Sequence, residues 1–258
     1  MKFIKMHGLG NDYLFLNCLE GEPEDLPALA VRMSDRHFGA GSDGLICLCP
    51  SAQGDFRMKM YNADGSEGAM CGNGIRCLAR YIRDQGLSDK KVMNIETKAG
   101  LRCVELLTDA VRVDMGPPQV SPPVEVEALG QIWRLIPVSM GNPHGVVFGE
   151  KTDCLDLPAV GPALEKHSAF PGGINVEFVE VLERNRLHMR VWERGSGETL
   201  ACGTGACAAL AAAFSAGLTK RNVWVELPGG TLAVSWEPSG TIFLTGPTAV
   251  VYEGEYPI

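Results

Sequence analysis

Two cysteine-bearing segments of this chain, 131 residues apart, have nearly the same sequence. The first reads CGNG at 71–74 and the second reads CGTG at 202–205. Each cysteine follows a glutamate by four residues, and each precedes a glycine by fifteen. Two copies of one thiol-bearing loop indicate two thiols that are used as a matched pair.

Both thiols, Cys71 and Cys202, come just before a predicted helix. The first turn of a helix has unpaired N–H groups and a partial positive charge, which lower the pKa of a nearby thiol. The same N–H groups can bind a carboxylate, and the flanking glycines allow a ligand to approach the backbone closely. Each loop therefore predicts a base together with a carboxylate site.

Two such loops predict proton transfer at a single carbon. If the two halves face each other, one thiolate can remove a proton from that carbon and the other thiol can return one on the opposite side. A neighbouring carboxylate held by the helix starts would have its developing enediolate charge stabilised by donors already in place. This is racemase or epimerase chemistry that needs neither pyridoxal phosphate nor a metal, so we expect no cofactor.

The elements that would position the two loops also repeat. The offset of 131 residues aligns strand-like stretches 56–61 and 187–192, and with one residue deleted it aligns 116–117 with 246–247. We predict an N-terminal half, 1–117, that carries Cys71 and is completed by 248–258, and a C-terminal half, 118–247, that carries Cys202. The proline-rich stretch 117–123 marks the boundary. The same offset aligns Asn11 with Asn142, Asn62 with Glu193, and Gly44 with Asn175.

Each half is predicted to consist mostly of strands around one main helix. The two helices are expected over 75–85 and 206–216, with Gly86 and Gly217 as C-cap glycines. This predicts an α+β fold of two pseudo-symmetric halves, each a curved, mostly antiparallel sheet wrapped around its central helix. Period-two alternation and β-propensity give strand candidates at 2–6, 12–17, 56–61, 92–96, 101–106, 110–114, 132–138, 176–182, 187–192, 223–227, 231–236 and 241–244.

Composition argues against several classes of protein. The net charge of −8 argues against a nucleic-acid partner. The longest apolar runs are shorter than the roughly 20 residues that a membrane helix needs, and the N-terminus does not read as a signal peptide. Nine cysteines, an odd number, favour a reducing cytoplasm, and without duplicated C-x2-C pairs we expect no structural zinc or other metal.

The motifs together resemble the diaminopimelate epimerase family over essentially the whole chain. They are MHGLGNDYL near the start, FGAGSDGL, MYNADGSEGAMCGNGIRC, MGNPH, INVEF, WERGSGETLACGTGACA and VYEGE near the end. The resemblance implies interconversion of LL- and meso-diaminopimelate, on the route to lysine and peptidoglycan. It implies Cys71 and Cys202 as alternating acid and base, and a homodimer with Tyr252 at the contact.

The resemblance also implies a set of binding residues. His144 and Glu193 match residues that adjust the pKa values of the cysteines, whereas Gly44 departs from members that carry a glutamine contact there. A substrate with a second amino-acid end needs extra fixed donors and acceptors, which asparagine, arginine and glutamate side chains supply. The positions that match substrate contacts are Asn11, Asn62, Gly72, Asn73, Asn142, Asn175, Glu193, Arg194, Gly203 and Thr204.

Two alternatives remain from the residues themselves. One is a racemase or epimerase for another amino acid, such as proline, hydroxyproline or histidine. The other is a thiol redox protein in which Cys71 and Cys202 form a switchable disulfide. Reversible oxidation would be the activity of a redox protein, whereas oxidation would only inactivate an epimerase.

Overall fold

The computed structural model describes residues 1–257, which form two compact units. Unit 1 is Met1–Val113 together with the described residues from Gly246 onward, and unit 2 is Asp114–Thr245. The boundaries expected from the sequence, after 117 and before 248, lie within a few residues of these limits. Among the described residues, no helix is long and apolar enough to cross a membrane.

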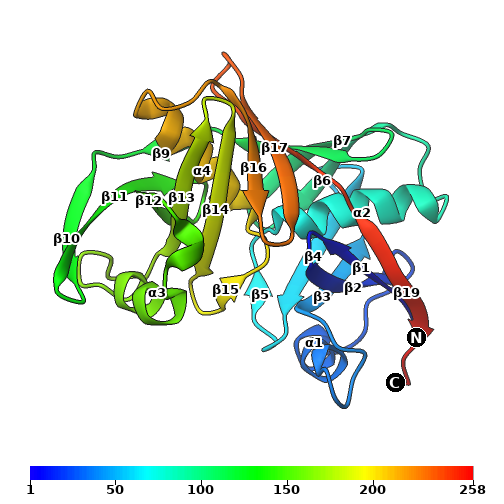
Figure 1. The fold of residues 1–258 in the computed structure, drawn as a ribbon. Helices are drawn as coiled ribbons and strands as arrows, with labels where there is room; N and C mark the ends of the chain where they lie inside the picture. The colour runs from blue at the N-terminus through cyan, green and yellow to red at the C-terminus, as the bar shows by residue number, and fades with distance from the viewer. Residues whose placement is uncertain (258) are drawn as a thin grey trace. The chain divides into compact units, whose positions relative to one another are not determined.

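Unit 1 contains a mixed sheet whose strands pair in the order β19, β1, β2, β3, β4, β6, β7, β8 (Figure 1). The β2–β3 and β4–β6 pairs are parallel and the others antiparallel, while β5 pairs with β4. The strands are β1 (Lys2–Gly8), β2 (Asn11–Asn17), β3 (Gly44–Cys49), β4 (Phe56–Asn62), β5 (Glu67–Gly68), β6 (Val92–Thr97), β7 (Gly100–Leu106), β8 (Val111–Gly116), which runs past the unit boundary, and β19 (Ala249–Glu255).

Unit 2 repeats this pairing with β10, β11, β12, β13, β14, β16, β17 and β18 in order. Here β12–β13 and β14–β16 are the parallel pairs, β15 pairs with β14, and β9 pairs with β11. The parallel steps fall at the same places in both sheets, which confirms the predicted α+β fold of two related halves. The strands are β9 (Gln119–Val120), β10 (Val124–Ala128), β11 (Gln131–Ser139), β12 (Pro143–Phe148), β13 (Asn175–Glu183), β14 (Arg186–Glu193), β15 (Gly197–Thr199), β16 (Asn222–Leu227), β17 (Gly230–Trp236) and β18 (Ile242–Gly246).

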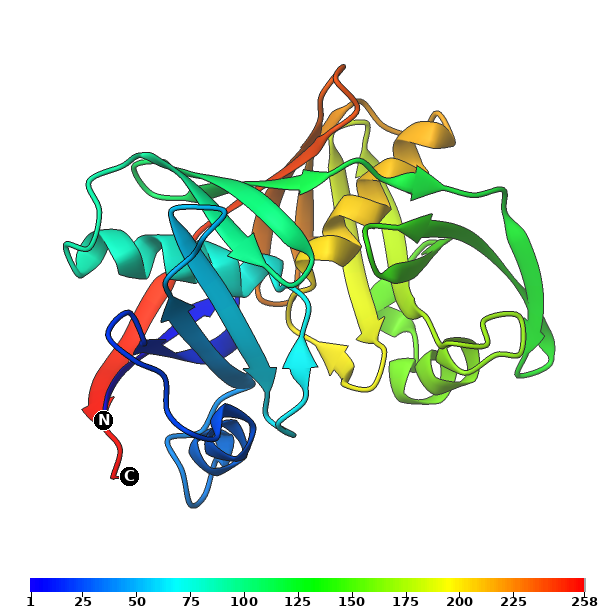
Figure 2. The ribbon, with the colours of Figure 1, turned by 180° about the vertical axis from the view of Figure 1, so that it is seen from behind.

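One long helix packs against each sheet: α2 (Gly72–Asp84) in unit 1 and α4 (Gly203–Ser215) in unit 2 (Figure 2). Both begin three residues earlier than predicted. The reason is that Cys71 and Cys202 are themselves the N-caps, a position more often filled by serine or aspartate. The predicted glycines end the helices, with φ of 66° at Gly86 and 75° at Gly217.

The two helices differ in what they bury. In α2, one face packs on β1 and β2 while Arg80 and Asp84 form an ion pair on the solvent side. In α4, the alanine-rich segment from Ala206 to Ala213 is buried all round, between β11, β12, β13 and β17. An unbroken apolar helix of small side chains is typical of a helix enclosed by its sheet.

Two shorter helices were missed by the sequence analysis: α1 (Leu26–Ser34) and α3 (Leu157–Glu165), besides a 3-10 turn, η1 (Thr152–Cys154). Each α-helix begins with an aspartate N-cap, Asp25 or Asp156, and has a proline within its first two positions. An aspartate cap followed by proline is a recognised helix start, so the signal was present.

Candidate active site

In unit 1, the Cys71 thiol lies between a helix start and an asparagine amide. Cys71 is half-buried and follows the short strand β5. Its Sγ accepts a hydrogen bond from the Gly74 N–H at 3.3 Å and donates one to Asn11 Oδ1, also at 3.3 Å. The predicted catalytic thiol and the predicted contact Asn11, 60 residues apart, therefore meet in one place.

A chain of side-chain hydrogen bonds continues from this point in both directions. Asn73 Nδ2 donates to Asn11 Oδ1 at 3.3 Å, and Asn11 Nδ2 donates to Asp43 Oδ2 at 2.9 Å. At the other end, the fully buried Arg76 donates to Asn73 Oδ1 at 3.0 Å and to the Gly72 carbonyl at 3.0 Å. The predicted residues Asn11 and Asn73 are therefore held by two charged residues that the sequence analysis left without a role.

Asn62 and Gly44 lie opposite each other on β4 and β3. The Asn62 amide donates to Ser66 Oγ at 3.0 Å and is near the surface. A Cβ added to Gly44 would lie 2.2 Å from the Tyr61 carbonyl oxygen and 3.0 Å from the Tyr13 ring. Because the first of these atoms is backbone, position 44 has no room for a side chain, and the glutamine that the resemblance would place there does not fit this backbone.

In unit 2, Cys202 occupies the equivalent N-cap but is buried, with 5% of its surface exposed. Its Sγ accepts from the Gly205 N–H at 3.3 Å and lies 3.6 Å from Thr204 Oγ1. Asn142 Nδ2 donates to the same Thr204 hydroxyl at 3.3 Å. The predicted group of Cys202, Thr204 and Asn142 is therefore assembled by the fold.

A buried histidine–glutamate pair lies next to this group. His144 Nδ1 and Glu177 Oε1 are 2.6 Å apart, and both side chains have no exposed surface. His144 Nε2 is 3.1 Å from Asn142 Oδ1. Glu177 Oε2 is buried without a hydrogen-bond partner among the described residues. His144 was predicted to act on a cysteine, and here it reaches Cys202 through Asn142 and Thr204.

The acidity of Cys202 differs from the sequence-based expectation. Burial raises the pKa of Cys202 well above its usual value, and the charges of Glu193 and Glu177 raise it further. Hydrogen bonds from Thr204 and the Gly205 N–H work in the opposite direction but are smaller. The prediction that the helix start would lower this pKa is wrong for Cys202 in this structure, because desolvation outweighs the helix N-terminus.

The carboxyl group of Glu193 is also desolvated, although part of the residue is exposed. Burial raises the pKa of Glu193, while hydrogen bonds with Thr199 and Cys202 lower it. Thr199 Oγ1 donates to Glu193 Oε1 at 2.5 Å. Glu193 is therefore fixed beside Cys202, as its predicted role in adjusting that thiol requires.

The predicted residue Arg194 lies in the turn after β14, next to Asn175 at the start of β13. Asn175 Oδ1 accepts from the Arg194 backbone N–H at 2.9 Å, and Arg194 Nη1 donates to the Gly172 carbonyl at 2.9 Å. Glu165, at the end of α3, accepts from the Gly195 N–H at 3.0 Å and from Trp192 Nε1 at 2.8 Å. The sequence analysis missed Glu165, which holds the Glu193–Gly195 turn in place.

Two more site residues, Asp43 and Glu177, were also missed. Glu177 had a sequence signal, because it is a charged residue within the apolar strand segment Val176–Val179. Asp43 had a weaker signal, since an aspartate before glycine is typical of a turn.

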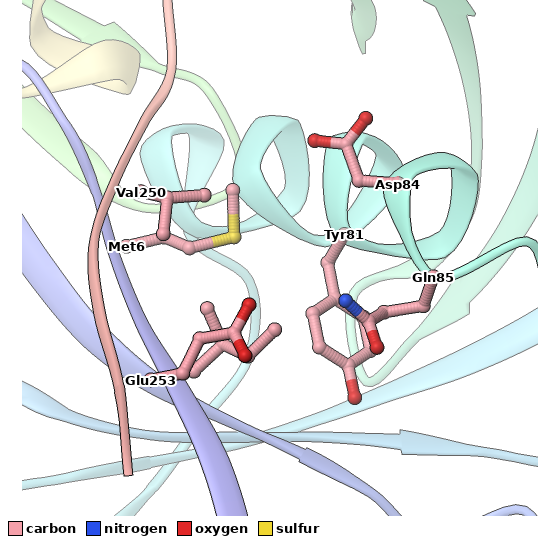
Figure 3. A pocket seen from close by; sticks show the side chains of 7 residues that line it. Met6, Tyr81, Asp84, Gln85, Val250 and Glu253 are labelled. Carbon is pink, nitrogen blue, oxygen red and sulfur yellow. The ribbon is translucent and has the colours of Figure 1, made fainter.

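The cavity shown in Figure 3 lies elsewhere in unit 1. It has a volume of about 240 Å³ and is lined from β1, α2 and β19 by residues that include Met6, Tyr81 and Glu253. It contains neither cysteine and none of the predicted contacts.

Among residues 1–257, no group of three or more histidine, cysteine or acidic side chains is arranged to hold a metal ion.

Comparison with solved structures bears on the fold. A Bacillus anthracis phenazine biosynthesis protein of the PhzF family superposes with a TM-score of 0.78 at 17% identity, covering 100% of this chain and 99% of that one. A hydroxyproline epimerase from Agrobacterium vitis gives a TM-score of 0.71 at 16% identity, covering 98% and 91%. At these identities the likeness concerns the fold alone.

Comparison with family models and curated proteins bears on the family. The model described as diaminopimelate epimerase matches residues 3–121 and 136–251. A diaminopimelate epimerase from Acetivibrio thermocellus is 47% identical over 99% of this chain and 98% of its own length. One from Methanococcus maripaludis is 44% identical over 100% of both. With the matches running through both cysteine loops, this chain belongs to the diaminopimelate epimerase family and is an isomerase.

Proposed function

We propose that Cys71 and Cys202 are the paired acid and base with which this enzyme interconverts LL- and meso-diaminopimelate. The epimerase function follows from the family. The observation that supports the pairing is that each thiol caps the central helix of its unit and accepts a hydrogen bond from the N–H three residues on. The two loops have the same backbone geometry, as two groups with interchangeable roles require.

In the proposed reaction, the thiolate of one cysteine removes the α-proton and becomes a thiol. The electron pair left on the carbon is delocalised into the α-carboxylate, giving an enediolate. The second thiol then gives its proton to the opposite face of the carbon and becomes the thiolate. Atoms and charge balance without a redox partner, and the reverse reaction restores the starting state.

We propose that the N–H groups at the two helix starts bind the reacting carboxylate. These are the backbone groups of Gly72–Asn73 and Gly203–Thr204, at the positive ends of α2 and α4. Donors fixed by a helix need no rearrangement as charge builds up on the carboxylate, so they stabilise the enediolate more than the ground state.

The spectator end of the substrate is proposed to meet the other polar residues. Asn62 and Asn175 offer amides, and Arg194 offers a guanidinium that can pair with a carboxylate. Glu193 supplies an acceptor for an ammonium group. Asn11 and Asn142, each beside a thiol, would contact the reacting end.

The test is chiral chromatography after incubation of the purified enzyme with LL-diaminopimelate. We expect meso-diaminopimelate to form until equilibrium, and in D₂O the product should carry deuterium at the inverted carbon. Turnover of proline, hydroxyproline or histidine in place of diaminopimelate would contradict the substrate assignment. Inversion without deuterium uptake would contradict proton transfer through exchangeable thiols.

We also propose that the enzyme is a homodimer that uses strand β19. This strand pairs with β1 and exposes Val250, Val251 and Tyr252. Sedimentation at several protein concentrations should show a dimer that Val251→Glu converts to a monomer. Ile132→Glu, which changes an exposed apolar residue of unit 2, is the control and should leave the dimer intact.

The odd number of cysteines supports a reducing, cytoplasmic location.

A further inference from the structure

The side-chain relay around Cys71 has its polarity fixed at both ends. Arg76 can only donate, so the oxygen of Asn73 must face it and the Asn73 amide group must donate onward. At the far end, the Asp43 carboxylate can only accept, so the amide group of Asn11 must face it. Both constraints leave Asn11 Oδ1 pointing at Asn73 and at the Cys71 thiol.

Asp43 is held as an acceptor by its other neighbours. Its Oδ1 accepts from Arg36 at 2.8 Å, and its Oδ2 also accepts from the Asp12 N–H at 3.1 Å. All of these partners donate to the carboxylate. Burial and the charge of Asp12 raise the pKa of Asp43, while the hydrogen bonds from the Asp12 N–H and Asn11 and the charge of Arg36 lower it. Arg36 and Lys5 in turn pair with Asp12, at 3.0 and 2.7 Å, which keeps the neighbouring negative charge compensated.

We propose that Asp43 is a positioning residue: by fixing the amide of Asn11, it presents an acceptor to Cys71 and keeps that cysteine a hydrogen-bond-donating thiol. The N–H of Gly74 favours the thiolate, as the N–H of Gly205 does for Cys202. The Asn11 oxygen opposes it, because a thiolate has no proton to donate. Tyr13 on β2 also faces this group: its buried hydroxyl forms side-chain hydrogen bonds with Cys71 and with Asn11. The other titratable or charged groups near Cys71 in this unit are Cys77, Asp43 and Arg76.

The consequence for catalysis rests on the proposed acid/base role of Cys71. A thiol held in its protonated form is ready to act as the acid of the pair. Loss of the fixed acceptor would lower kcat more in the direction in which Cys71 donates its proton. The two kcat/KM values would fall by the same factor, since the reaction equilibrium fixes their ratio.

The decisive experiment measures alkylation of each cysteine by iodoacetamide against pH, with mass spectrometry and without substrate. Because only the thiolate reacts, the pH midpoint reports the proton affinity of the thiol. Asp43→Asn should move the Cys71 midpoint down by roughly one pH unit, about tenfold in thiolate fraction below the midpoint, and leave Cys202 unchanged. Asp25→Asn removes the same charge from a helix cap in unit 1 and should change neither thiol.

A double variant separates positioning from simple loss of charge. Asn11→Leu removes the acceptor itself and should lower the Cys71 midpoint by a similar amount. If Asp43 acts through Asn11, adding Asp43→Asn to Asn11→Leu should produce almost no further shift. A full second shift would mean that Asp43 acts only through its charge and would overturn the proposal.

Two further outcomes complete the test. An unchanged Cys71 midpoint in folded Asp43→Asn would also overturn the proposal. If Asp43→Asn does not fold, Asn11→Leu alone still decides, because an unchanged midpoint there removes the link between amide and thiol. The readout needs no turnover, so failure of the two-cysteine mechanism would show up separately, as retained epimerisation in Cys71→Ala.

Discussion

The thiol loops of the two units have the same backbone and opposite surroundings. In unit 1, Cys71 is half-buried and donates to a fixed amide oxygen. In unit 2, Cys202 is buried beside a threonine hydroxyl and the carboxyl groups of Glu193 and Glu177. The two cysteines therefore occupy the same N-cap position in their units. They differ in the neighbouring groups that determine the proton affinity of each thiol.

The asymmetry can be traced to side chains at repeat-related positions. In unit 1, Ile46 lies next to Gly74 in the first turn of α2. In unit 2, the corresponding neighbour of Gly205 is Glu177, which follows Ile46 by 131 residues. By the same offset, Tyr13 corresponds to His144 and Asp43 to Ile174. The repeat has kept the glycines, the cysteines and the strand pairing, while the residues below the thiols have diverged.

The divergence also changes how firmly each relay is oriented. In unit 1, Arg76 and Asp43 fix both ends, but their counterparts in unit 2 are Cys207 and Ile174. There the relay ends at His144, whose Nε2 can carry a proton or accept one. The amide of Asn142 can therefore face either way, depending on which ring nitrogen of His144 carries the proton.

Removing either sulfur atom is expected to have the largest effect. Cys71→Ala and Cys202→Ala should each lower kcat about 10³-fold in both directions, because each removes one of the two proton-transfer groups. Chiral chromatography measures this, and Cys→Ser variants serve as shape-matched controls with weaker acids. If one alanine variant kept full activity, the two loops would not be functional equivalents.

Adding one methyl group beneath each thiol should affect the two loops differently. At Gly205, a Cβ would lie 2.7 Å from Glu177 Oε1 and 3.2 Å from Cys202 Sγ. At Gly74, its closest neighbour is the terminal Cδ1 of Ile46 at 2.5 Å. We expect Gly205→Ala to lower kcat about 100-fold by displacing the thiol or the carboxylate. Gly74→Ala should mainly reduce stability, by about 1–3 kcal/mol.

The measurements are kcat and the thermal unfolding midpoint of both glycine variants. Equal losses of kcat would show that the first helical turns have the same tolerance in both units. That result would contradict the expectation that a charged neighbour, Glu177, makes the turn in unit 2 less tolerant than the aliphatic neighbour, Ile46, makes the turn in unit 1.

Neutralising Glu193 should change only the unit 2 thiol. Of the two carboxylates whose charge raises the pKa of Cys202, Glu193 has the larger effect, so Glu193→Gln should lower that pKa. The pH midpoint for alkylation of Cys202 should fall accordingly, and that of Cys71 should not move. Glu198→Gln, which changes a carboxylate paired with Arg190, is the matched control. A shift of both thiols would mean that the two environments are not independent.

The smallest effect concerns the buried thiol inside helix α2. Burial raises the pKa of Cys77 to about 12, from an ordinary value of 9.0. Because the pKa of Cys77 is higher in the folded protein than in the unfolded chain, its contribution to the unfolding free energy is fully present below pH 9. That contribution is lost as pH rises from 9 towards 12. Ala208, at the equivalent position of α4, cannot titrate.

Between pH 8 and pH 10, the wild-type protein should therefore lose about 1 kcal/mol more unfolding free energy than Cys77→Ala. Denaturant unfolding at the two pH values measures the difference. Cys154→Ala, which removes an exposed thiol, is the control. An equal loss in wild type and Cys77→Ala would show that Cys77 is not the group responsible.

Much of the site was predictable because its signals are local or repeated. The two CG-x-G loops, the glycines that end the helices and the pairing of Asn11 with Asn142 are visible in the printed sequence. The partners Asp43 and Glu177 were not predicted, because parallel strand pairs bring them in from about 30 residues away. Tyr13 on β2 pairs with Gly44 on β3, and Val146 on β12 pairs with Glu177 on β13. Parallel register depends on the crossover between strands and has no short-range pattern.

By itself, then, the sequence determined the duplicated architecture, the two capping thiols and the isomerase family, because each follows from residue types at fixed spacing. Only the tertiary structure decided how the two thiols differ. Burial and neighbouring carboxylates make Cys202 a weaker acid than a helix start alone would predict. The charged ends of the relay in unit 1 decide which atom of Asn11 faces Cys71. Both depend on desolvation and on contacts between distant strands, which spacing along the chain does not encode.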